Sequence, residues 1–202
     1  MSKLKVDQIS KASGASPATF TLPATDGSAG QYLKTDGSGA LSWGTPPDQK
    51  ITNASSWAQT ATQTGSKNPI TADLALRTTA GQGNLGDAMT VSTGVFTFPS
   101  TGYWHIIARF TFNRAAGDSQ ASGFIKSTTN DGGAWTIVAS AYKSLDSIAT
   151  YGSTSASCIL DITDTSNNKV SFQTSHDNAG NTTVGNANGA YTSFTFIRLA
   201  DT

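Results

Sequence analysis

The chain lacks glutamate altogether, has one cysteine and carries few charges of either sign. Only 13% of its 202 residues are charged, against about 25% in an ordinary soluble protein. The 13 basic and 13 acidic residues balance, and no dense cluster of lysine and arginine occurs. Binding to nucleic acid through counterion release therefore has no source in this sequence, and we expect no nucleic-acid partner.

The single cysteine, Cys158, excludes an intrachain disulfide, so the fold does not depend on an oxidising compartment. It lies in a strand-like run, Ala156 to Leu160, with no histidine or cation beside it. That setting favours a buried, unreactive thiol over a nucleophile. The chain also has no apolar run of about 18 residues and no apolar segment near Met1, so we expect neither a membrane span nor a secretory signal peptide.

Residues able to carry catalysis or hold a metal are scarce. His105 and His176 are the only histidines, and with one cysteine they are too few for a zinc site. No nucleophile-elbow motif surrounds a serine, and nothing indicates a pair of catalytic carboxylates. We therefore predict no enzyme activity and no cofactor. Calcium is the more credible metal, with oxygen donors at Asp161, Asp164 and Asp177-Asn178, although solvated turns explain these residues better.

The N-terminal region, residues 1–44, is polar and rich in turn signals. Asp26-Gly27 and Asp36-Gly37 stand between short apolar pieces, which is a strong hairpin signal. Leu4 and Val6 alternate as a short strand would, whereas the residues from Asp7 to Ser10 could instead begin a helical turn. One chain cannot enclose the larger apolar side chains of this region, but three copies packed about an axis would bury them. These side chains are Leu22, Leu33, Leu41 and Trp43.

A proline-rich hinge, residues 45–48, follows this region, because paired prolines favour an extended spacer. Residues 49–202 contain many short alternating runs separated by polar turns, with no helical period. This pattern is typical of an all-β sandwich or barrel. The predicted strands are Ile51–Gln63, Leu74–Thr79, Met89–Val91, Val95–Phe98, Tyr103–Asn113, Ser122–Thr128, Trp135–Lys143, Thr154–Ile162, Lys169–Ser175 and Tyr191–Leu199.

The run from Tyr103 to Asn113 separates into two faces. One face is apolar and predicted to lie in the core; it comprises Trp104, Ile106, Ala108, Phe110 and Phe112. The opposite face is too apolar to lie in solvent and too polar to lie in a core. One face of the last predicted strand, Tyr191–Leu199, has the same mixed character. We predict that these two faces form a subunit contact rather than an ordinary exposed sheet. The predicted contact residues are Tyr103, His105, Ile107, Arg109, Tyr191, Ile197 and Leu199.

The segment from Thr93 to Phe112 resembles the signature of C1q/TNF-like jelly rolls. It contains Gly94-Val95-Phe96-Thr97-Phe98-Pro99 and then Gly102-Tyr103-Trp104, and the resemblance extends to Lys169–Gln173 and Thr192–Leu199. It implies a jelly-roll sandwich that assembles as a homotrimer, and it is the main support for the predicted subunit contact. The turn before the third of these segments lacks the family's Gly-Asp, and no collagen-like repeat precedes the domain.

The N-terminal region resembles a short stalk-like element of phage tail fibres and other virion proteins, Gly-Gln-x-Leu-x-Thr-Asp-Gly-Ser-Gly-x-Leu-x-Trp. The matching residues are Gly30, Gln31, Leu33, Thr35, Asp36, Gly37, Ser38, Gly39, Leu41 and Trp43. The resemblance implies a trimeric bacteriophage fibre on the virion surface, made in the host cytoplasm. Residues 1–44 would then attach it to capsid or tail proteins.

Three functions stay open for such a fibre. Adhesion of the head to a host surface is the first hypothesis, capsid decoration or cementing without a receptor is the second, and depolymerisation of a surface polysaccharide is the third. Trp135, Tyr142 and Tyr151 could stack on a host glycan. We nevertheless expect Trp57 and Trp135 in the core.

Overall fold

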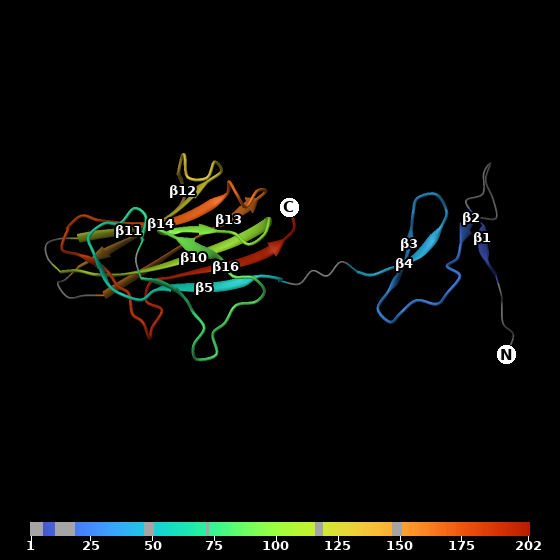
Figure 1. Ribbon diagram of the computed structural model, residues 1–202, viewed down its shortest axis with the longest axis horizontal. Helices are drawn as coiled ribbons and strands as arrows, with labels where there is room; N and C mark the ends of the chain where they lie inside the picture. Colours follow the sequence, from blue (N-terminus) through green and yellow to red (C-terminus); the bar gives the residue numbers. More distant parts are fainter. Residues whose placement is uncertain (1–5, 11–18, 47–50, 72, 116–118, 147–150) are drawn as a thin grey trace. The chain divides into compact units, whose positions relative to one another are not determined.

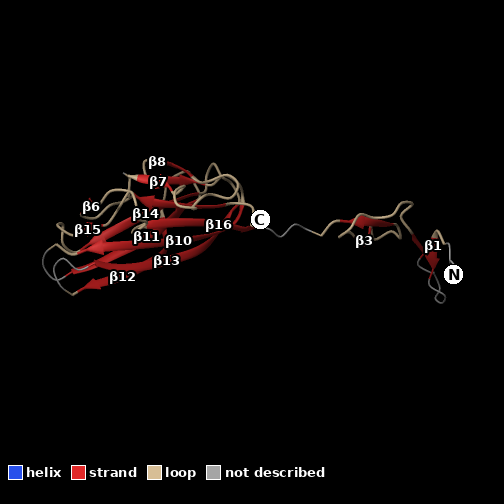
Figure 2. Ribbon diagram, turned by 90° about the horizontal axis from the view of Figure 1, so that it is seen from below, coloured by secondary structure: helices blue, strands red, loops and turns tan. Residues whose placement is uncertain are grey.

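The computed structural model describes residues 6–10, 19–46, 51–71, 73–115, 119–146 and 151–202. The chain divides into two compact units, residues 1–49 and residues 50–202, which we call the N-terminal unit and the head. All regular structure in the described residues is β-strand, as the sequence predicted (Figure 2). That part of the chain accordingly has no helix that could span a membrane.

The N-terminal unit contains two small antiparallel sheets. Strand β1 (Gln8–Ser10) pairs with β2 (Thr19–Thr21), and β3 (Tyr32–Thr35) pairs with β4 (Leu41–Gly44) (Figure 1). The alternative of a helical turn at the first strand was therefore wrong. Leu4 and the second half of the predicted hinge lie outside the described residues.

The hairpin of β3 and β4 closes through the predicted Asp36-Gly37 turn. The Oδ1 atom of Asp36 accepts hydrogen bonds from the backbone N–H groups of Ser38 at 2.7 Å and Ala40 at 3.1 Å. Gly37 and Gly39 have φ angles of 83° and 98°, a region that side chains other than glycine rarely enter. The motif thus fixes the turn through both its aspartate and its glycines.

The other Asp-Gly pair, Asp26-Gly27, does not form a hairpin, because it lies in the loop between two separate sheets. The indole of Trp43 covers Gly27 so closely that a Cβ atom there would lie 2.5 Å from the ring. Trp43 Nε1 also donates a hydrogen bond to the carbonyl oxygen of Thr25 at 2.8 Å. The glycine is needed here for close packing rather than for a turn.

The head is a sandwich of two antiparallel sheets. The first sheet contains β5 (Ala54–Gln59), β6 (Gln63–Thr64), β7 (Leu74–Leu76), β10 (Gly102–Asn113), β13 (Tyr151–Ile162), β15 (Thr182–Thr183) and β16 (Ser193–Ala200). Strand β10 is its centre: β13 pairs along its whole length on one side, and β16 followed by β15 pairs on the other (Figure 1). Strand β5 continues the sheet beyond β16 and leads to β7.

The second sheet has the order β12-β11-β14-β9-β8. Its strands are β8 (Thr90–Ser92), β9 (Val95–Thr97), β11 (Ser119–Thr128), β12 (Thr136–Leu145) and β14 (Lys169–His176). Strands β8 and β9 and strands β11 and β12 are neighbours in the chain, whereas β14 joins these two pairs by long-range pairing with β9 and β11.

Aromatic side chains fill the space between the two sheets. The whole predicted core face of β10 is buried, and so are seven of the eight head phenylalanines, all except Phe124. Phe172 of the second sheet stacks on Phe194 of the first, with ring centroids 3.7 Å apart. Gly123 lets the sheets approach, because a Cβ atom there would lie 2.1 Å from the ring of Phe110. Core packing therefore fixes the distance between the layers.

Every predicted strand of the head differs from the observed one at one end or both, mostly by one to three residues. The run Ile51–Gln63 contains two strands, β5 and β6, separated by the three residues Thr60 to Thr62. The strand predicted at Met89–Val91 begins and ends one residue later. The two-residue strand β15 was missed, since two residues carry no alternation.

Candidate functional site

The outward face of the first sheet carries apolar side chains in register across three strands. His105 of β10 lies between Ile159 of β13 and Ile197 of β16. Ile107 lies in the next row, between a serine and a threonine. Together with Tyr103 and Leu199 at one end, these residues form what we call the apolar face: Tyr103, His105, Ile107, Ile159, Ile197 and Leu199.

The apolar face is open to solvent in the single chain. Ile159 exposes 60% of its surface, Leu199 43% and Tyr103 40%, whereas His105, Ile107 and Ile197 are half-buried. Charges of both signs border the face: Arg109 is exposed at one end and Asp161 at the other. Among the described residues no carboxylate pairs with Arg109. This composition resembles an interface core with a charged rim.

Six of the seven predicted contact residues lie on this face or at its border. Tyr191 does not, because β16 begins two residues after it. The carbonyl oxygen of Tyr191 accepts a hydrogen bond from Thr111 Oγ1 at 2.7 Å. Its exposed ring and that of Tyr151 line a separate pocket of about 530 Å³ at the end of the sheet.

Sequence reasoning missed Ile159, the most exposed apolar residue of the face. Along its strand, exposed positions alternate with positions that are buried or half-buried. Ile159, for example, is exposed between the half-buried Cys158 and Leu160. That alternation was a usable signal. It needed the pairing of β13 with β10 to show that Ile159 lies beside His105.

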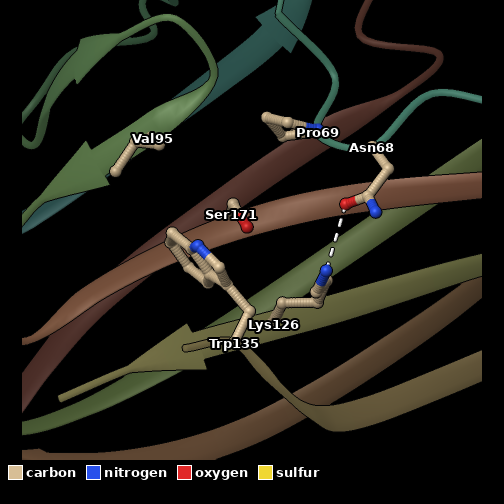
Figure 3. A pocket seen from close by; sticks show the side chains of 6 residues that line it. All are labelled: Asn68, Pro69, Val95, Lys126, Trp135 and Ser171. Carbon is tan, nitrogen blue, oxygen red and sulfur yellow. Dashed lines mark hydrogen bonds between the residues drawn. The ribbon is translucent and has the colours of Figure 1, made fainter. Parts of the chain in front are cut away.

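A second feature is a pocket of about 230 Å³ on the outward face of the second sheet. Val95 of β9, Ser171 of β14 and Lys126 of β11 stand in one cross-strand row that forms its floor. Trp135, immediately before β12, forms one wall, and the loop residues Asn68 and Pro69 form the opposite wall (Figure 3).

Backbone contacts fix the loop over this pocket. The loop runs beside β14, where the N–H of Ile70 donates to the carbonyl of Phe172 at 2.8 Å and Lys67 exchanges two hydrogen bonds with Thr174. The side chain of Ile70 is buried in the core. The pocket is therefore built into the fold before any ligand arrives.

Trp135 was predicted in the core, and this was wrong. It stands outside the regular pleat of β12 and is half-buried against the pocket rather than between the sheets. Trp57 does pack against the core, edge-on to Phe96 at a ring-centroid distance of 5.5 Å. Tyr142 is 59% exposed on β12 and does not line the pocket.

Two of the predicted calcium donors, Asp164 and Asp177, accept hydrogen bonds that stabilise loops of the head. Asp164 accepts hydrogen bonds from the backbone of Ser166 and the side chain of Asn167, both at 2.7 Å, and these bonds lower the pKa of its carboxyl group. Asp177 accepts a hydrogen bond from the backbone N–H of Gln120 at 3.1 Å. In the described ranges no three histidine, cysteine or acidic side chains gather as metal ligands would.

The protein environment shifts the pKa of two further groups of the head, Cys158 and His176. Cys158 is half-buried, and burial raises the pKa of its thiol to about 11. His176 is buried edge-on against Phe112, and its Nε2 lies 3.1 Å from Thr183 Oγ1. Burial lowers the pKa of this imidazole, although Asp177 opposes the shift.

In the N-terminal unit the structure gathers three of the predicted stalk residues. Leu22, Leu33 and Trp43 line a pocket of about 400 Å³. Leu33 pairs with Trp43 across the hairpin and is 47% exposed. Leu41, at the start of β4, is half-buried. The unit thus leaves apolar surface uncovered.

No protein-family model matches the chain, and no curated protein matches its sequence. Solved structures do match. A crystal structure of murine APRIL at pH 5.0 is 10% identical, with a TM-score of 0.54 over 73% of this chain and 98% of that chain. The structure of Eiger TNF from S. frugiperda is 11% identical, with a TM-score of 0.53 over 76% and 96%. At such identities the likeness concerns the fold alone: the head is a TNF-like jelly roll.

Proposed function

We propose that this chain is a self-associating structural protein, a trimeric bacteriophage fibre whose head adheres to the host surface. The observation that carries the proposal is the apolar face of the first sheet. Isolated apolar residues are common on protein surfaces, but a contiguous apolar patch rimmed by charge marks an interaction site. The occupant we assign to it is a further copy of this chain.

Two observations favour a copy of the same chain over another partner. The face carries its own opposite charges, Arg109 and Asp161, so one surface supplies both members of an ion pair to its neighbours. The jelly-roll fold and the signature around Tyr103 resemble a family of trimers. We therefore place three subunits about an axis, with the apolar faces of the heads turned toward it.

The N-terminal unit supplies the attachment in this proposal. Its residues resemble the stalk-like element of phage fibres, and Leu33 and Trp43 leave apolar surface for capsid or tail proteins or for the other two chains. The protein would act on the virion surface by shape and valency, with no catalytic step. Three identical weak sites acting in parallel bind far more tightly than one.

The solution mass tests the assembly. Light scattering after size exclusion would be run on the full chain and on residues 50–202, which hold their own core. Three chains in both samples are expected. A trimer in the full chain alone would assign assembly to the N-terminal unit, and a monomer in both would overturn the proposal.

A capsid-cementing role is the second candidate, favoured by the uncovered pocket of Leu22, Leu33 and Trp43. Binding to empty capsids and to host cells separates the two roles. An adhesive fibre should bind cells through the isolated head. A cement protein should bind capsids through the N-terminal unit, raise their thermal stability and leave cells unbound.

A further inference from the structure

We propose that the pocket between Trp135 and the loop at Asn68 binds a carboxylate-bearing sugar ring. The inference rests on the proposed adhesive function of the head, and it names the chemistry of what the head would bind. The pocket lies on the second sheet, away from the apolar face of the first. A trimer assembled through that face would leave all three pockets open.

The charge of Lys126 is the first argument. Its side chain is half-buried beside the pocket, and its ammonium group donates one hydrogen bond, to Asn68 Oδ1 at 3.0 Å (Figure 3). No carboxylate in the described part of the chain pairs with it. An ammonium group has three N–H donors, so two are left for a ligand, and a carboxylate would supply the missing opposite charge.

The hydroxyl of Ser171 is the second argument. Ser171 exposes only 3% of its surface, yet its side chain lines the pocket. Its hydroxyl forms no hydrogen bond within the described ranges, and it is not one of the buried polar atoms left without a partner, so it opens into the pocket. A hydroxyl that is free to donate and to accept at the floor of an open pocket favours a polar ligand over an apolar one.

The shape of the pocket selects a sugar. The indole of Trp135 offers a flat apolar wall of the kind on which a pyranose ring stacks, and Val95 and Pro69 complete the apolar lining. A volume of about 230 Å³ is below the roughly 300–1,000 Å³ of clefts for drug-sized ligands. It suits a single ring that presents hydroxyls to Ser171 and a carboxylate to Lys126.

Calorimetric titration of the full chain with methyl glucuronide, and with its neutral counterpart methyl glucoside, tests this assignment. The glucuronide should bind at least about tenfold more tightly, since a charged hydrogen bond is worth that factor or more. The Lys126→Met variant should abolish the difference, and Trp135→Ala should weaken both sugars. Lys34→Met removes the same charge from the N-terminal unit and should change neither affinity.

Equal affinity for the two sugars, no binding of either, or unchanged preference in Lys126→Met would overturn the proposal. Inorganic sulfate binding as tightly as the glucuronide would also overturn it, because the pocket would then be an anion site without sugar recognition. Circular dichroism of each variant checks the fold. A host-cell binding assay tests the proposed function separately. A chain that binds the glucuronide but not host cells would refute adhesion and leave the assignment of the pocket intact.

Discussion

Replacing Ile159 by aspartate should dissociate the proposed trimer. Ile159 leaves 60% of its surface exposed in the single chain. Full burial of an isoleucine stabilises by about 1.5–3 kcal/mol, so burying this fraction at a subunit contact contributes about 1–2 kcal/mol per copy. Three copies give about 3–5 kcal/mol, which weakens the trimer roughly a hundredfold to a few thousandfold. The desolvation of three carboxylates adds to this loss.

Ile137 supplies a matched control. It is also an isoleucine on a strand and 50% exposed, but it belongs to β12 of the second sheet. Ile137→Asp should therefore keep the wild-type mass. Light scattering over a dilution series would follow the mass of both variants, and urea unfolding would confirm that each is folded.

Two results would refute this reasoning. An Ile159→Asp variant that keeps the wild-type mass at every dilution would show that the apolar face is not the contact. Equal dissociation of both variants would show that exposed isoleucines matter for a reason unrelated to this face. A folded monomer for Ile159→Asp alone is the expected result.

Three further predictions concern the core. Gly123→Ala should lower the free energy of unfolding, measured in urea, by about 1–3 kcal/mol, because the added methyl group would overlap the buried ring of Phe110. Gly83 lies at an open position, so Gly83→Ala should change the free energy of unfolding by less than about 0.5 kcal/mol. Equal effects of the two substitutions would contradict the packing argument. The thiol of Cys158, whose pKa burial raises to about 11, should react with iodoacetamide at pH 8 much more slowly in the native protein than in urea; equal rates would disprove its protection. Because burial lowers the pKa of His176, the unfolded chain takes up the proton first, so the free energy of unfolding should fall as the pH drops from about 7 to about 5. His176→Gln should remove part of that slope, and an unchanged slope would count against the assignment.

The sequence was most informative where alternation was long. From Gly102 to Phe110 strand β10 alternates between buried positions and outward positions that are exposed or half-buried, and a period of two is enough to assign such faces without any partner strand. The core of the head and the composition of half of the apolar face follow from it. The strand that places Ile159 beside His105 is about 50 residues away, and no local pattern specifies that register.

The pocket as a whole could not be predicted for the same reason, although Trp135 was among the aromatic residues that could stack on a glycan. Val95, Ser171 and Lys126 come from three strands, and their row exists only because β14 pairs with both β9 and β11. The indole of Trp135 suggests a core residue by size, since large aromatics contribute most to burial. Trp135 precedes the first residue of β12, however, so it does not take part in the alternation of that strand.

The outward faces of the two sheets suit different partners, because they carry different side chains. The face of the first sheet holds branched apolar side chains in adjacent rows, so it gains most from a flat, dry contact with another protein surface. The second sheet offers the ammonium group of Lys126, which pairs with no carboxylate of the described residues, together with the hydroxyl of Ser171 and the indole of Trp135 around a small pocket. Those groups gain most from a compact polar ligand. Because different strands build the two surfaces, loss of assembly should reduce the valency of binding and leave the affinity of each pocket unchanged.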